Sequence, residues 1–198
     1  MDIKYIKRYI TMIIGSILLG LAIGASIIYG WGSDAISIFL KGLSTQFHLS
    51  YTILTLSFNF ITISISLILD HKQVGLGTIG VMLFSTFGIE LSQLIIIGFN
   101  NIYYNLPLLF IAYNIYIFAI ALIIVSNTGK GPYEALIFSI NKYINIEFYI
   151  IKWFIDILFL TIGIILGGGF TFTTILFIIF SGKGITFWVN TLNKRFIL

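Results

Sequence analysis

Six long apolar runs constrain this chain more than any other feature of its sequence. They are Tyr9–Tyr29, Ser50–Leu69, Gly75–Ile97, Leu106–Ser126, Phe148–Leu166 and Thr171–Asn190. A helix needs about 20 apolar residues to cross the hydrocarbon core of a bilayer. Only 9% of the residues are charged, whereas a water-soluble domain is about one quarter charged. The sequence therefore predicts an all-α, polytopic membrane protein with six transmembrane helices.

Two further apolar stretches are too short to cross a membrane comfortably. They are Asp34–Phe47 and Glu134–Ile146, and each follows a glycine-rich turn. Helices of this length are typical of re-entrant or interfacial segments. We therefore expect two short helices in addition to the six spans.

The basic residues indicate the orientation of the spans. With the N-terminus in the cytoplasm, the inner side receives Lys4, Lys7, Arg8, Lys72, Lys130, Lys142, Lys194 and Arg195. The outer side then receives Lys41 alone, and Lys152 and Lys183 fall inside spans. Cytoplasmic loops of membrane proteins carry an excess of Lys and Arg. This bias predicts a multi-pass protein of the cell membrane with both termini in the cytoplasm.

The two halves of the chain share one order of features, which predicts an internal repeat. An acidic turn at 30–35 matches one at 129–135, and a Gly/Thr turn at 75–79 matches one at 167–175. Asp34 and Glu134 are 100 positions apart, and Thr78 and Thr174 are 96 apart. We expect repeats at 1–98 and 99–198 within one membrane domain. Three spans in each would place the second repeat upside down, a common plan of transporters. If the short helices also span, the repeat would be parallel, but the basic residues favour three spans.

The turns carry a resemblance to a known family. The Gly-x-Gly-Pro-Tyr-Glu turn at Gly129–Glu134, with the Gly-Leu-Gly-Thr turn at Gly75–Thr78, resembles the YczE/YyaS/YitT-type family of small bacterial membrane proteins. The likeness covers nearly the whole chain. It departs from the family pattern at Ser33, where proline is expected, and at 172–174. The resemblance implies a fold plan and a bacterial inner membrane, with no settled activity or substrate.

Buried charges are the first candidates for a site. Lys152 and Asp156 lie four positions apart on the fifth span, so they share one helix face. Asn59 lies at the matching place on the second span, in a polar stripe. One reading is an internal ion pair and a polar packing seam. The other is a hydrated path that faces the opposite half.

Glu90 on the third span and Lys183 on the sixth are a second pair of candidates. Lys183 can extend its ammonium to the interface, and Glu90 can lie at a polar helix end. Alternatively, the two residues form gates or an ion relay. The sequence leaves both readings open.

The acidic turns are the third candidate region. Asp34 and Glu134 begin the two short helices, where a carboxylate complements the helix dipole and caps free N–H groups. Contact with a substrate or cation is the alternative reading, and it includes Gly131 and Pro132. The remaining repeat-turn candidates are Gly75, Gly77, Thr78, Gly129 and Thr174.

Several function classes find no support in the sequence. There is no nucleophile elbow, P-loop or HExxH motif, so no catalytic residue and no enzyme activity are predicted. The chain has no cysteine, and His48 and His71 stand alone, so no metal site or cofactor is expected. The basic residues flank the apolar runs, which indicates contact with the bilayer and not with nucleic acid.

The leading hypothesis is a permease for a small molecule or ion, with its site between the repeats. The alternatives are a substrate-binding subunit of a modular uptake system, and an accessory or regulatory membrane protein. The small residues Gly20 and Gly24 on the first span predict close helix packing or a docking face for a protein partner. A homo-oligomer is also open.

Overall fold

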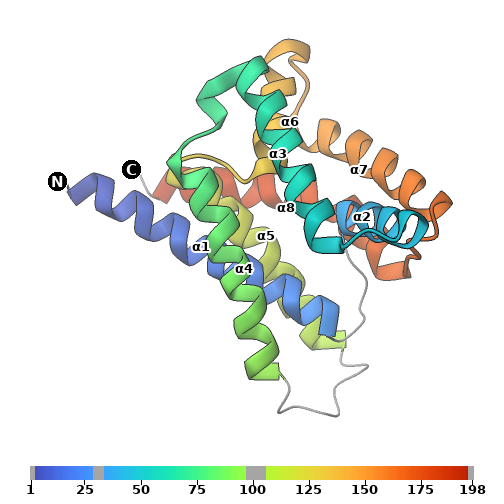
Figure 1. The fold of residues 1–198 in the computed structure, drawn as a ribbon. Helices are drawn as coiled ribbons and strands as arrows, with labels where there is room; N and C mark the ends of the chain where they lie inside the picture. Colours follow the sequence, from blue (N-terminus) through green and yellow to red (C-terminus); the bar gives the residue numbers. More distant parts are fainter. Residues whose placement is uncertain (1–2, 29–33, 97–105, 196–198) are drawn as a thin grey trace.

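The structure is a computed structural model, and it describes residues 3–28, 34–96 and 106–195. The described part is all-helical (Figure 1). Its helices are α1 (Ile3–Ile28), α2 (Ala35–Phe47), α3 (Tyr51–Asp70), α4 (Leu76–Ile96), α5 (Leu106–Ser126), α6 (Pro132–Ile144), α7 (Phe148–Ile165) and α8 (Phe172–Arg195). A short 3-10 turn, η1 (His71–Gln73), follows α3.

Five of these helices are long and apolar enough to cross a membrane. The stretches are Lys4–Ser26, Ile53–Gln73, Leu108–Ser126, Phe148–Ile165 and Thr173–Lys194. The apolar stretch of α4, Leu76–Ser92, is shorter than these five. The expectation of an all-α, multi-pass membrane protein is thus confirmed, with five candidate spans.

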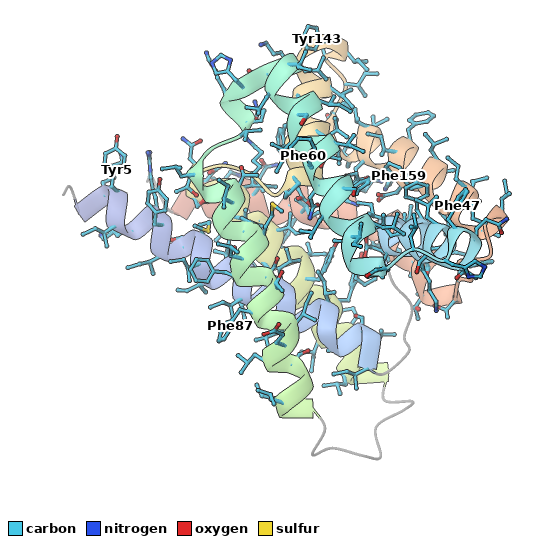
Figure 2. The ribbon with its side chains drawn as sticks, viewed as in Figure 1. Tyr5, Phe47, Phe60, Phe87, Tyr143 and Phe159 are labelled. Atoms are coloured by element: carbon cyan, nitrogen blue, oxygen red, sulfur yellow. The ribbon has the colours of Figure 1, made fainter. Side chains whose placement is uncertain are left out.

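Large apolar side chains cover the outside of the helices, which supports a lipid environment. Phe60 on α3 is 73% exposed and Phe154 on α7 is 75% exposed. Phe87 and Phe47 project away from the ribbon (Figure 2). In water such a surface would associate or aggregate, whereas in a bilayer it contacts acyl chains.

The short helices begin and end for local reasons. Asp34 caps α2, since its carboxylate accepts from the Ser37 N–H at 3.4 Å and from the Ser37 hydroxyl at 2.6 Å. Pro132 fits the first turn of α6 because its missing N–H needs no helical partner there. Both helices end at a residue in the left-handed conformation, His48 after α2 and Asn145 after α6. At 13 residues each they are about 20 Å long, too short to cross the core.

Small residues bring α1 close to its neighbours. A Cβ atom on Gly20 would lie 2.8 Å from the Cα of Gly88 on α4, and one on Gly24 would lie 2.8 Å from the Ser92 Cβ. A Cβ on Gly15 would lie 3.0 Å from the Ala119 carbonyl of α5. The close packing predicted from Gly20 and Gly24 is therefore confirmed, and the contact lies within the chain. This face of α1 is not open to a protein partner.

The remaining helices pack in a consistent set of pairs. Besides the contacts of α1 with α4 and α5, α2 packs against α7, α6 packs against α3, and α8 packs against α5. The short helices also contact their sequence neighbours, α2 with α3 and α6 with α7. Helices α4 and α1 cross on one side of the molecule, while α2 and α7 lie together on the other (Figure 1). Elements of the two sequence halves are therefore interleaved, and each short helix packs against a long helix of the opposite half.

Candidate binding site

A buried charged triad lies where α6 meets α7. The Lys152 ammonium is 2.5 Å from one carboxylate oxygen of Asp156, and the Tyr133 hydroxyl donates to the other oxygen at 2.5 Å. The ammonium also lies 5.4 Å from the centre of the Tyr133 ring. Lys152 and Asp156 are only 4% and 3% exposed. The expected pair within α7 is present, and Tyr133 completes it. We call these three residues the Lys152 triad.

Apolar side chains surround the Lys152 triad. Ile137 and Ile151 are buried against Tyr133, and Phe58 and Phe159 pack beside them. Buried charges remain ionised in such surroundings only when they are paired and hydrogen-bonded. Sequence reasoning missed the role of Tyr133. Its position in the Gly-x-Gly-Pro-Tyr-Glu turn, one residue before an acid, was the available signal.

The first turns of both short helices lie near this triad. Asp34, Glu134 and Asp156 all act electrostatically on the Tyr116 hydroxyl of α5. Glu134 is also influenced by Lys152 and Asp34. Five helices therefore contribute to one region, which holds three carboxylates and one ammonium. Its residues are Asp34 of α2, Tyr51 of α3, Tyr116 of α5, Tyr133 and Glu134 of α6, and Lys152 and Asp156 of α7. We call this region the central cluster.

Glu134 differs from Asp34 within this cluster. Asp34 is satisfied by Ser37, as the capping role predicts. Burial raises the pKa of the Glu134 carboxyl above its usual range, and the neighbouring carboxylates Asp156 and Asp34 add to this effect. The Glu134 backbone N–H and the charge of Lys152 act in the opposite direction. The surroundings of Glu134 therefore favour the protonated form of its carboxyl.

The two glycine-rich turns that carry the family resemblance contact each other. The Gly77 N–H donates to the Thr128 carbonyl at 3.0 Å, and the Gly75 N–H donates to the Thr78 hydroxyl at 3.1 Å. A Cβ on Gly77 would lie 2.8 Å from the Thr128 Cβ. Gly129 has φ +131°, and a Cβ there would lie 2.7 Å from the Thr78 hydroxyl. The sequence predicted these glycines as separate turns, whereas the fold uses them in one close contact.

A polar network extends from this contact. The Lys130 ammonium donates to the Gln73 side-chain carbonyl at 2.5 Å, and Gln73 donates to the Asp70 carboxylate at 2.7 Å. Lys142 lies 3.3 Å from the other Asp70 oxygen. Burial lowers the pKa of Lys130, and the charge of Asp70 partly opposes this. These four residues, which we call the Asp70 latch, join α3 and η1 of the first half to the start and end of α6. Sequence reasoning did not select Asp70 or Gln73, although they directly precede the Gly-Leu-Gly-Thr turn.

The second Gly/Thr turn lies against α2. The Thr174 N–H donates to the Thr171 carbonyl at 3.0 Å, and the Thr174 side chain is buried. A Cβ on Gly168 would collide with the Ile38 carbonyl, and one on Gly163 would lie 2.7 Å from the Phe39 nitrogen. The first acidic turn, 30–33, lies outside the described residues.

Three candidates do not join the central cluster. Glu90 is exposed on α4. Lys183 is exposed on α8, where its ammonium lies 5.7 Å and 5.2 Å from the ring centres of Tyr149 and Trp153. Asn59 is half-buried on α3, in a stripe whose hydroxyls bond back to carbonyls of the preceding turn, as Thr62 does to Phe58 at 3.0 Å. This bonding agrees with a packing role for the stripe.

The surface between α5 and α8 is concave. It is an open groove of about 770 Å³. Its lining comprises Leu109, Phe110, Tyr113, Asn114, Ile117, Thr173, Leu176, Phe177, Phe180, Lys183, Gly184, Phe187 and Trp188. Lys183 is the one charged residue among them. Within residues 3–28, 34–96 and 106–195, no three His, Asp or Glu side chains are placed to hold a metal ion.

Comparison with known families assigns the chain as a whole. A model of DUF6198, a family of unknown function, matches residues 6–190. The chain belongs to this family. The match includes α2 to α7 and most of α1 and α8, so the triad, the latch and both glycine-rich turns are features of a DUF6198 member. No curated protein and no solved structure matches the chain.

Proposed function

We propose that the chain is a permease that carries a small molecule or ion through the central cluster, between two inverted repeats. The observation that carries the proposal is the Lys152 triad. A charged pair this deeply buried is costly in a membrane protein and is typical of substrate or ion pathways. It also lies beside the first turns of short helices from both halves, as binding sites of inverted-repeat transporters do.

The helix pairs support the repeat. The test is to exchange each helix of the first half for its counterpart in the second, α1 for α5, α2 for α6, α3 for α7 and α4 for α8. This exchange turns the contact between α1 and α4 into the contact between α5 and α8, and the contact between α2 and α7 into that between α6 and α3. It also converts the α2–α3 pair into α6–α7, while the α1–α5 pair maps onto itself. In this scheme α4 also crosses the membrane, which makes six spans in all, and both termini are cytoplasmic. Helices α2 and α6 are re-entrant and enter the membrane from opposite sides.

Differences between the two halves support alternating access. Helix α4 meets α1 at Gly88 and Gly20, whereas α8 meets α5 at Gly184 and Ile117. In addition, α8 packs against α7, and α4 has no comparable packing against α3. Two repeats with one plan but different packing suit a transporter in one of its two states. Exchange of the two packings would give the other state, with opening at the opposite membrane face.

Ligand-induced stabilisation of the purified chain tests the proposal. The melting temperature in detergent is recorded against a panel of inorganic ions, amino acids, amines and vitamins. A ligand at 100 times its Kd stabilises by about 2.7 kcal/mol. We expect a specific shift that is lost in Glu134→Gln, a variant that keeps the shape of the side chain. Uptake of the same compound into liposomes containing only this chain then distinguishes a permease from a binding subunit. A panel without any shift would contradict the proposal and favour an accessory role.

A further inference from the structure

The groove between α5 and α8 is an apolar channel along the outer surface of the helices. Its lining runs from Thr173 to Trp188, a length of about 22 Å along α8. That exceeds half of a hydrocarbon core about 30 Å thick. Its volume of about 770 Å³ lies in the range of small-molecule sites. The groove is therefore long and large enough for a hydrocarbon chain that lies parallel to the helices.

The groove lies beside the contact between α5 and α8, which is less close than the contact between α1 and α4. In the first half, Gly20 and Gly88 let α1 and α4 touch through their backbones. In the second half, the Ile117 side chain lies against Gly184, so this contact is made by a side chain and not by two backbones. Aromatic contacts of Phe177 with Tyr113, at 4.5 Å between ring centres, close the inner wall. The groove is thus a built feature of this helix pair.

The lining of the groove carries one positive charge, on Lys183. The Lys183 ammonium lies over the rings of Tyr149 and Trp153, which belong to the first two turns of α7. The Trp153 indole is fixed by its N–H bond to the Ile179 carbonyl at 3.0 Å. Among the described residues no carboxylate pairs with Lys183. Lys183 itself lies within the candidate span Thr173–Lys194, but its ammonium extends to the start of α7, and Tyr and Trp rings at a helix start are typical of the level where lipid headgroups lie.

We propose that this groove binds an anionic phospholipid of the surrounding bilayer. An acyl chain lies along the phenylalanine-lined groove, and the phosphate pairs with Lys183. A charged lysine with free N–H donors suits a phosphate, and the apolar lining suits the chain. This site is separate from the central cluster, so its test does not depend on the proposed transport.

Lipid binding to the purified, delipidated chain tests the proposal. Phosphatidylglycerol and phosphatidylcholine with identical acyl chains, brominated on those chains, are titrated in detergent while tryptophan fluorescence is followed. Trp188 lines the groove, so a bound chain quenches it. We expect the anionic lipid to bind about fivefold more tightly, the effect of one basic residue near an anionic headgroup.

Matched variants locate the binding. Lys183→Gln is expected to remove the preference for phosphatidylglycerol, and Lys183→Arg to keep it. Lys194→Gln, an exposed cation near the end of the same helix, is the control and should leave the preference unchanged. Leu176→Trp adds volume at an exposed position of the groove lining and should weaken both lipids.

Three results would overturn the proposal. Equal affinity of the wild type for both lipids, or an unchanged preference in Lys183→Gln, would remove the phosphate contact. A stable dimer that forms without lipid and dissociates in Leu176→Trp would assign the groove to a second copy of the chain. The unfolding temperature of each variant without lipid shows that the fold is retained.

Discussion

The Lys142 ammonium lies 3.3 Å from the Asp70 carboxylate, and this ion pair joins the end of α6 to the end of α3. The equivalent place in the other half is occupied by Gly42 of α2 and Leu166 after α7. There a Cβ on Gly42 would lie 2.9 Å from the Leu166 Cβ. One junction is thus polar and the other is a close apolar contact. A polar junction separates at lower cost where water can reach it, so under the proposed permease function the Asp70 latch is the junction that we expect to open as a gate.

The ion pair of the latch should contribute little to stability. The Asp70 side chain is only 6% exposed, but the Lys142 side chain is 53% exposed, so water screens the pair as in surface pairs, which contribute about 0.2–1 kcal/mol. A double-mutant cycle with Asp70→Asn and Lys142→Gln, measured by unfolding in detergent, is expected to give a coupling energy in this range. A coupling several times larger would show that the latch is a structural lock and not a gate.

The Lys152 triad separates stability from function. Asp156→Asn leaves the Lys152 charge buried and unpaired, which typically costs about 3–5 kcal/mol. The triple change Tyr133→Phe, Lys152→Met and Asp156→Leu replaces all polar partners by apolar groups, so the fold should retain close to wild-type stability. The same variant should bind no ligand. Retained binding in the triple variant would exclude the triad from the site.

The α1–α4 seam should not tolerate a larger residue. Gly20→Ala forces a Cβ against the backbone of α4, and overpacking of this kind costs about 1–3 kcal/mol. Gly80→Ala is the matched control, because its Cβ would meet only the flexible end of Met12. That change should be neutral or stabilising by up to about 1 kcal/mol through helix propensity. Thermal unfolding of both variants shows whether the loss of stability arises at the close contact between α1 and α4 or follows any Gly→Ala change in these two helices.

Glu134 should make stability depend on pH. Its pKa is raised in the fold, so the folded chain binds the proton more tightly than the unfolded chain does. This contribution is complete below the unfolded pKa of about 4.3 and is lost as pH rises through the folded pKa. The melting temperature of the wild type should therefore fall over that interval relative to Glu134→Gln. Parallel pH profiles of the two proteins would argue against a raised pKa.

Opposite orientation of the short helices can be read in cells. Reporter fusions after Phe47 and after Ile146 follow the ends of α2 and α6. We expect the first reporter outside and the second inside, because the basic residues predict that the ends of α2 and α6 lie on opposite sides of the membrane. Two reporters on the same side would contradict the inverted repeat.

Much of this fold follows from local sequence patterns. The apolar runs predicted the long helices, and the turns predicted where the short ones begin, since Asp34 and Pro132 act on their own helices. Helix α1 begins at Ile3, earlier than the apolar run, because Lys4, Lys7 and Arg8 are good helix formers whose charges can extend to the interface. The pairing of Lys152 with Asp156 was also predictable, because a spacing of four residues places both on one helix face.

Tertiary structure alone decided which distant groups meet. Nothing in the spacing of Tyr133 and Asp156 indicates their hydrogen bond, and the Asp70–Lys142 ion pair depends on how α3 crosses α6. The exposed placement of Glu90 and Lys183 also depended on which faces of α4 and α8 their neighbours cover. The sequence by itself determined that the long helices are apolar enough for a membrane, where the helices lie and how they are capped, because hydropathy and capping act within a few turns of one chain segment. The assembly of the central cluster, the latch and the groove required the packing of helices far apart in sequence. There the size of one side chain matters: Gly20 lets α1 meet α4 through the backbone, whereas Ile117 at the equivalent place on α5 meets α8 through its side chain.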